Sequence, residues 1–274
     1  MKVFSKKTLC SAGFTLALAT TGMGSASATT LELALVLDGS GSINAANWDL
    51  QLKGYKDVFA SGTFFDNFVA PSKYDTLVVS AYQFGYGVTQ EIGWTSITDN
   101  SSATDFGNLF TFSQVKGNTN TEGAILTAMG GSSIYDGLLN NGIASDKMVI
   151  DISTDGVPNY CVKGGAYDVS STGISCSSSV ADSHAIAAAD YARSSDITVN
   201  AIGVGSVDVS FLTNLVNGTP DGFFLTASGF DTFGDTLKTK LGKEIIGVPE
   251  PSILFLFGAG LLGLGVVKRR KQMA

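Results

Sequence analysis

The stretch Leu31–Ser42, which reads LELALVLDGSGS, decides the fold. Its first seven residues form an apolar run, which is typical of a strand buried on both faces of a parallel sheet. The run ends at Asp38, and the glycines that follow allow a tight loop. The apolar spacing directly after this loop predicts a helix over residues 46–60. The stretch therefore predicts a strand–loop–helix unit whose loop carries polar side chains.

The alternation of strand and helix continues along the chain. We expect strands at Leu31–Leu37, Thr76–Phe84, Val88–Trp94, Lys147–Ser153, Ile197–Val204 and Phe223–Thr226. We expect helices at Ala46–Ala60, Ala103–Phe112, Thr121–Leu139, Val180–Ser194, Val209–Val216 and Phe230–Ile246. This order predicts an α/β fold with a doubly wound, mostly parallel sheet, one antiparallel edge strand and helices on both faces. Because no internal repeat or interdomain linker is visible, we expect residues 29–247 to form one domain.

The first 28 residues have the pattern of a secretory signal peptide. Lysines lie near the N-terminus, a short apolar stretch runs from Leu9 to Leu18, and Ala26–Ala28 has the small residues of a cleavage site. The apolar stretch is too short to span a bilayer, which argues against the alternative of a membrane anchor. We therefore expect export and cleavage before Thr29.

Residues 248–274 contain three parts in a fixed order: Val-Pro-Glu-Pro, an apolar run over residues 252–267 and a basic cluster over residues 268–271. They resemble the PEP-CTERM sorting signal. The resemblance implies a transmembrane helix that anchors the chain transiently in the inner membrane, cleavage by an exosortase-type enzyme, and delivery to the cell surface or extracellular matrix of a Gram-negative bacterium. The run would measure about 24 Å as a helix, slightly short of a ~30 Å hydrocarbon core. A plain C-terminal anchor is the alternative, although it would not need the Pro-Glu-Pro.

The charge of the chain excludes one class of partner. The whole chain has 17 basic and 24 acidic residues, and removing both ends leaves 10 basic and 23 acidic residues, a net charge of −13. Such a surface repels phosphate backbones, so we expect no nucleic-acid binding. Cys161 and Cys176 remain in the mature chain, and an oxidising compartment favours a disulfide between them over two free thiols.

At three places in the sequence, several side chains that carry oxygen atoms lie directly after a predicted strand or directly before a predicted helix. These are Asp38–Ser42, Gly117–Glu122 and Ser153–Gly156. Each string alone is better explained by a turn or a helix N-cap than by a metal site. Together they converge, because open α/β sheets bind ligands outside the carboxyl ends of their strands. Hydroxyl and carboxylate oxygens are the ligands that Mg²⁺, Mn²⁺ and Ca²⁺ prefer, and no His or Cys near these loops would attract zinc.

These three strings resemble the metal-ion-dependent adhesion site of von Willebrand factor type A and integrin I domains. That site has the pattern D-x-S-x-S, then T-x-T, then T-D-G. The resemblance assigns five metal-site residues: Asp38, Ser40, Ser42, Thr119 and Asp155. It implies that the hydroxyls bind the metal directly, that the carboxylates act largely through water, and that a ligand carboxylate fills an open position.

The sequence thus predicts a non-enzymatic, metal-dependent binding or adhesion module. Its ligand would be a protein or polysaccharide that carries a carboxylate. A metal-assisted hydrolase and a passive matrix protein with a structural metal are the alternatives. The single histidine, His184, and the lack of a G-x-S-x-G string argue against the enzyme. Asp151 interrupts an apolar strand, and we expect it to be a paired structural carboxylate.

Overall fold

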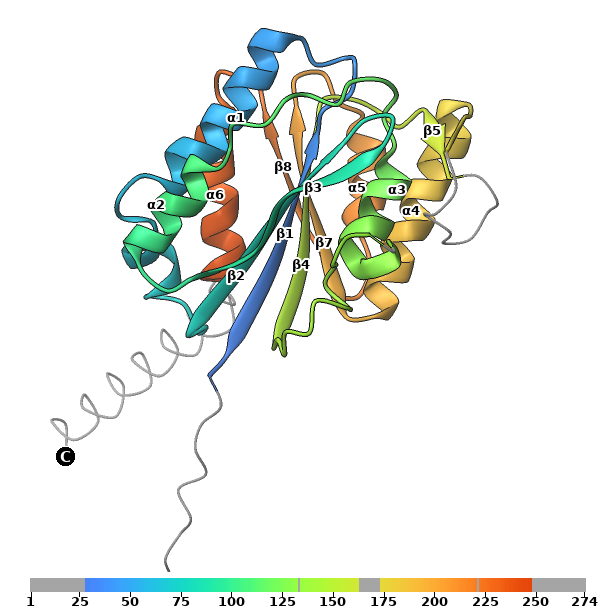
Figure 1. Ribbon diagram of the computed structural model, residues 1–274. Coiled ribbons are helices and arrows are strands. Elements are labelled where there is room, and N and C mark those ends of the chain that lie inside the picture. Colours follow the sequence, from blue (N-terminus) through green and yellow to red (C-terminus); the bar gives the residue numbers. More distant parts are fainter. Residues whose placement is uncertain (1–27, 133, 163–172, 221, 248–274) are drawn as a thin grey trace, which may run out of the picture.

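The computed structural model describes residues 28–247, apart from residues 133, 163–172 and 221. Its centre is a six-stranded sheet in the order β3-β2-β1-β4-β7-β8 (Figure 1). All neighbouring strands pair in parallel except β2 and β3. The predicted fold class is therefore confirmed, including the antiparallel edge. The strands are β1 (Thr30–Asp38), β2 (Thr76–Phe84), β3 (Val88–Ile97), β4 (Lys147–Thr154), β7 (Ile197–Val204) and β8 (Phe224–Ala227).

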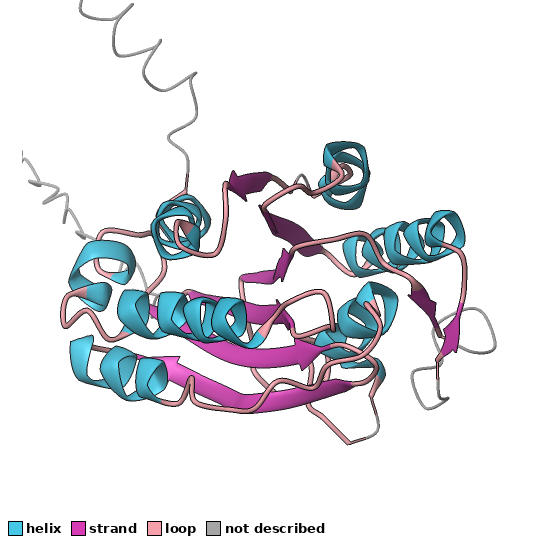
Figure 2. Ribbon diagram, turned by 90° about the horizontal axis from the view of Figure 1, so that it is seen from above, coloured by secondary structure: helices cyan, strands magenta, loops and turns pink. Residues whose placement is uncertain are grey.

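Helices cover both faces of the sheet (Figures 1 and 2). One layer holds α1 (Ala45–Phe59), α2 (Asn100–Asn108) and α6 (Phe233–Ile245). The other holds α3 (Thr121–Leu126), α4 (Ser178–Ser194) and α5 (Val209–Val216). Successive side chains of a strand point to opposite faces, so Leu33 and Leu35 of β1 join the first layer, whereas Ala34 and Val36 join the second. The apolar run of β1 is thereby buried on both sides.

The predicted helix over residues 121–139 is too long. Helix α3 ends at Leu126, and a single π-helical turn, Thr127–Gly131, follows it. Gly130 has a φ of +118°, a conformation that other residues rarely adopt, and it ends the helical path. The Gly-Gly pair in the sequence could have indicated this end of the helix. The prediction instead gave more weight to the helical spacing of the apolar residues.

The predicted helix over residues 103–112 lies a few residues earlier in the chain, at α2. Asp99 caps it, because its side chain accepts a hydrogen bond of 2.7 Å from the backbone N–H of Ser102. Residues 110–116 then run as a loop towards the carboxyl ends of the strands.

The long irregular stretch after β4 contains a small two-stranded antiparallel sheet, β5 (Tyr160–Cys161) and β6 (Ile174–Ser175). The predicted disulfide between Cys161 and Cys176 is present, with a Cα–Cα distance of 6.0 Å. The disulfide joins the last residue of β5 to the residue after β6. Figure 1 shows β5 beside α3 and α4.

The prediction of a transmembrane helix is wrong. Within the described ranges, no helix is long and apolar enough to cross a membrane. The run over residues 252–267 itself lies outside the described residues, and at 16 residues it is shorter than the ~20 that a spanning helix needs. The signal peptide (residues 1–28) and the tail (residues 248–274) also fall outside them, apart from residue 28, and the three domain limits stay predictions.

Candidate metal centre

Asp38 is fully buried at the end of β1, and both of its carboxylate oxygens are held. Its Oδ1 accepts a hydrogen bond of 2.9 Å from the backbone N–H of Ser40, which closes the loop. Its Oδ2 accepts a hydrogen bond of 2.7 Å from the hydroxyl of Thr154, at the end of β4. Because β1 and β4 are neighbours in the sheet, Asp38 fixes the first and third of the predicted ligand strings against each other.

The side chains of Ser40, Ser42 and Asp155 form a continuous set of oxygens. The two serine hydroxyls are 3.0 Å apart, and the hydroxyl of Ser42 donates to Oδ1 of Asp155 at 2.7 Å. Ser40 is buried, whereas Ser42 is exposed and Asp155 is half-buried. The oxygens therefore lead from the buried Asp38 outward to solvent, so a ligand can reach this edge.

Thr119 is brought to the same edge by its loop. The backbone N–H of Gly41 donates to the carbonyl of Gly117 at 2.7 Å, which joins the first ligand string to the second. Asn159 holds Thr119 on both sides: its side-chain oxygen accepts from the Thr119 N–H at 2.9 Å, and its own N–H donates to the Thr119 carbonyl at 3.1 Å. The backbone of Thr119 is thus fixed, and its side chain is almost completely buried.

The electrostatics of this edge suit a cation. Burial raises the pKa of Asp38 to about 6, and the negative charge of Asp155 adds to that effect. Burial also raises the pKa of Asp155. Within the part of the chain that the structure describes, neither carboxylate forms an ion pair with a basic side chain. Two buried or half-buried carboxylates, surrounded by hydroxyls and amides, form an oxygen-only donor set that fits a hard divalent cation.

Three glutamines that the sequence analysis missed support the loops. The amide of Gln51 donates to the carbonyl of Asp38 at 2.9 Å. The amide of Gln114 donates to the carbonyls of Ser40 and Ile43 at 2.9 and 2.8 Å. The amide oxygen of Gln83 accepts from the backbone of the 110–116 loop at 2.7 Å. A glutamine inside an otherwise apolar element, such as Gln83 in β2, is the sequence feature that could have indicated such a supporting role.

Asp151 is paired, as expected, and belongs to a buried ionic cluster. Its carboxylate forms an ion pair with Lys240 of α6, which also contacts Glu244 at 2.5 Å. The amide of Asn200 donates to the same Glu244 oxygen at 2.7 Å. Burial raises the pKa of Glu244 to about 7, and the charge of Asp151 acts in the same direction. The cluster joins α6 to β4 and β7 inside the core and has a structural role.

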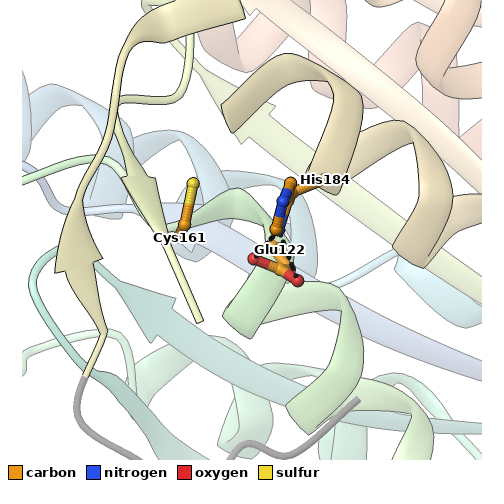
Figure 3. Close-up of side chains that lie close together, drawn as sticks. All are labelled: Glu122, Cys161 and His184. Atoms are coloured by element: carbon orange, nitrogen blue, oxygen red, sulfur yellow. Dashed lines mark hydrogen bonds and ion pairs between the residues drawn. The ribbon is translucent and has the colours of Figure 1, made fainter. Parts of the chain in front are cut away.

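A second group of potential ligands lies beside the disulfide: Glu122, Cys161 and His184 (Figure 3). His184 Nδ1 lies 3.1 Å from a Glu122 oxygen, so the histidine is paired with a carboxylate. That oxygen also accepts a hydrogen bond of 2.7 Å from the N–H of Val162. The sulfur of Cys161 is bonded to Cys176 and offers no thiolate to a metal. The group therefore tethers the disulfide segment to α3 and α4.

Residues 28–249 match the family described as "Protein of unknown function (DUF1194)", and residues 247–271 match the PEP-CTERM protein-sorting motif. The second match indicates export and sorting to the cell surface, and it implies processing by an exosortase-type enzyme. Among the curated proteins, none matches the chain.

Several solved structures share the fold. Proximal thread matrix protein 1 from the mussel byssus aligns with a TM-score of 0.51 and 19% identity over 78% of this chain and 47% of that chain. The pilus adhesin SpaC from Lactobacillus rhamnosus GG aligns with a TM-score of 0.56 and 17% identity over 80% and 31% of the two chains. The vWF domain of the pili tip protein Mfa5 from Porphyromonas gingivalis aligns with a TM-score of 0.52 and 11% identity over 80% and 97%.

This chain spans less than half the length of the first two proteins, and identities this low show the fold alone. The fold is that of von Willebrand factor type A domains. Since the first family match covers most of the sequence, the chain belongs to the DUF1194 family.

Proposed function

We propose that this protein is an exported, non-enzymatic binding module that captures an acidic ligand through a divalent cation. Five residues would form the site: Asp38, Ser40, Ser42, Thr119 and Asp155. The observation that carries the proposal is the series of contacts from Asp38 to Asp155. The backbone N–H of Ser40 donates to Asp38 Oδ1 at 2.9 Å, the hydroxyls of Ser40 and Ser42 are 3.0 Å apart, and the hydroxyl of Ser42 donates to Asp155 Oδ1 at 2.7 Å. Side chains from two strand ends converge there without a basic partner among the described residues.

The donor set supports a particular kind of cation. Ser40, Ser42 and Thr119 would contact it directly, and the two aspartates would act largely through water. Mg²⁺, Mn²⁺ and Ca²⁺ prefer such oxygen ligands. One structure of the mussel thread matrix protein has a TM-score of 0.50 and 18% identity. It is described as having a zinc-occupied MIDAS motif, the abbreviation for metal-ion-dependent adhesion site. That description concerns the mussel protein, and it supports a divalent cation at the equivalent edge here.

The low charge of the donor set gives the bound cation its function. Two carboxylates and three hydroxyls supply a charge of only about −2, so the cation keeps its attraction for a further anionic oxygen. A carboxylate on a protein or polysaccharide would supply that oxygen. The exposed Ser42 and half-buried Asp155 lie where such a ligand would approach. The place of action would be the cell surface or extracellular matrix of a Gram-negative bacterium.

The test is calorimetric titration of Mg²⁺ or Mn²⁺ into the parent and Asp155→Ala. The substitution removes one of two carboxylates, so affinity should fall at least tenfold, or about 1.4 kcal/mol. Asp105→Ala is the matched control, because Asp105 is exposed on α2 and the charge change is the same. The melting temperature of the metal-free Asp155→Ala protein should stay close to that of the parent.

Capture of envelope components with and without EDTA then separates a ligand site from a structural metal. The parent should retain its ligand only without EDTA, and Asp155→Ala should retain none. If Asp155→Ala binds metal as tightly as the parent, the five residues do not form a site.

A further inference from the structure

A pocket lies at the end of the sheet that is opposite to the metal centre. It has a volume of about 410 Å³, which is within the range of small-ligand sites. Its walls come from the loop before β2, the amino ends of β4 and β7, the residue before β8 and the end of α6. We call it the lysine pocket, because Lys73, Lys147 and Lys243 line it.

These three lysines are concentrated in a chain that is poor in cations. The region between the two predicted ends has only 10 basic residues against 23 acidic ones. Three of the ten line the lysine pocket, and a fourth, Lys240, is buried beneath it over the ring of Phe223. Because the three lysines come from separate segments of the chain, the fold itself brings their like charges together.

None of the three ammonium groups forms an ion pair with a residue that the structure describes. Lys73 lies over the ring of Tyr74 at 5.1 Å, and Lys243 lies over the ring of Phe223 at 5.7 Å. Lys147 is half-buried and has no such ring contact in the described part. Burial lowers the pKa of Lys147 and the charge of Lys73 lowers it further, while Glu244 and Asp196 act in the opposite direction.

Four acidic residues lie near these lysines in space or in sequence, and none of them forms an ion pair with Lys73, Lys147 or Lys243: Asp75, Asp146, Asp196 and Glu244. The carboxylate of Asp75 accepts a hydrogen bond of 2.8 Å from the N–H of Thr29, and that of Asp146 accepts one of 2.7 Å from the N–H of Thr30. Glu244 lines the pocket, but one of its oxygens is bound by Lys240 and Asn200. Of the charged residues that line the pocket itself, three are lysines and one is a glutamate, so its walls carry more positive than negative groups.

We propose that the lysine pocket binds a small anion, a phosphate or a carboxylate group, through Lys73, Lys147 and Lys243. An anion between the three ammonium groups would relieve their mutual repulsion and supply the missing partner of Lys147. Ammonium groups bind such anions as point charges, with up to three donors each. The rings of Tyr74 and Phe223 and the hydroxyl-bearing Thr198 complete the walls. The volume exceeds that of a bare anion, so the group can be carried on a small organic molecule.

The test is calorimetric titration of the full chain with inorganic phosphate, glucuronate and glucose, at constant ionic strength and in EDTA. EDTA is essential, because it removes any metal that could bind the same anions at the other end of the sheet. The parent should bind phosphate or glucuronate but not glucose. Lys147→Met keeps the length and apolar stem of the side chain, and it should weaken anion binding at least tenfold.

Lys238→Met is the matched control, because Lys238 is exposed on α6, outside the lysine pocket, and the charge change is the same. It should bind the anions like the parent. Lys73→Met, at an exposed loop position, repeats the test if Lys147→Met does not fold. Equal binding by the parent and the pocket variants, or equal binding of glucose, would overturn the proposal.

Discussion

The two ends of the central sheet carry opposite chemistry. At the carboxyl end, carboxylates and hydroxyls face one another without a basic partner among the described residues. At the amino end, three lysines and Glu244 line one pocket, and none of the three lysines forms an ion pair with a described residue. Between them lies the buried cluster of Asp151, Lys240 and Glu244, in which charges of both signs contact each other. In the cluster each carboxylate is in contact with the ammonium group of Lys240, whereas the charged side chains at each end have no ion-pair partner among the described residues.

Under the two proposals above, this difference distinguishes charges that stabilise the fold from charges that bind a ligand. A buried charge that serves only the fold is paired, because an unpaired one is costly. An uncompensated set near solvent costs less and can attract a ligand of the opposite sign. Lys240 and Lys147 show the contrast, because one is fully buried between two carboxylates and the other is half-buried beside another lysine.

The largest expected effect comes from breaking the paired cluster. Lys240→Met should lower the free energy of unfolding by about 3–5 kcal/mol, because it leaves Asp151 and Glu244 buried without a cation. Urea denaturation measures this change. Lys238→Met, an exposed position on the same helix, should change the stability by less than about 0.5 kcal/mol. Similar stabilities for the two variants would mean that the cluster is not a structural one.

The disulfide beside the carboxyl end gives the next largest effect. Replacing Cys161 and Cys176 with serine opens a connection with a sequence separation of 15. The chain-entropy model predicts a loss of about 3 kcal/mol for a loop of this size. Urea denaturation of the double variant measures the loss, and the reduced parent should match it. A reduced parent as stable as the oxidised one would show that Glu122 and its contacts hold this segment without the bond.

The meeting of Asp38, Ser40, Ser42 and Asp155 at the carboxyl end could be predicted from the sequence, because its signals are local. The string from Asp38 to Ser42 is continuous, it begins at the end of an apolar strand, and the topology brings it to Asp155, directly after the neighbouring strand β4. The alternation of apolar segments gave the sheet and both helical layers. The prediction of a helix over residues 121–139 was too long, because the apolar spacing continues across Gly130, where the backbone turns.

The amino end could not be predicted in the same way. Lys73, Lys147 and Lys243 are separated by more than 70 residues at each step, and no spacing rule relates them. The same holds for Asn159, which fixes Thr119 across 40 residues. Such contacts depend on loop paths and on the packing of α6, which local periodicity does not encode. Sequence patterns thus predict which side chains meet at neighbouring strand ends better than they predict pockets assembled from distant segments.

The smallest expected effect tests whether the two ends act independently. Strand β4 runs from Lys147, in the lysine pocket, to Thr154, next to Asp155, and eight residues at about 3.3 Å each separate the ends by roughly 25 Å. That distance is about three Debye lengths at physiological ionic strength, so the charge of Lys147 should scarcely be felt at the metal centre. Lys147→Met should therefore change the affinity for Mg²⁺ by less than about 0.5 kcal/mol, as expected for distant sites. Asp155→Ala should likewise leave phosphate binding in EDTA unchanged. Calorimetry on the two single variants and the double variant measures both effects. A tenfold change in either affinity would mean that β4 couples the ends, and the two sites would then have to be described as one system.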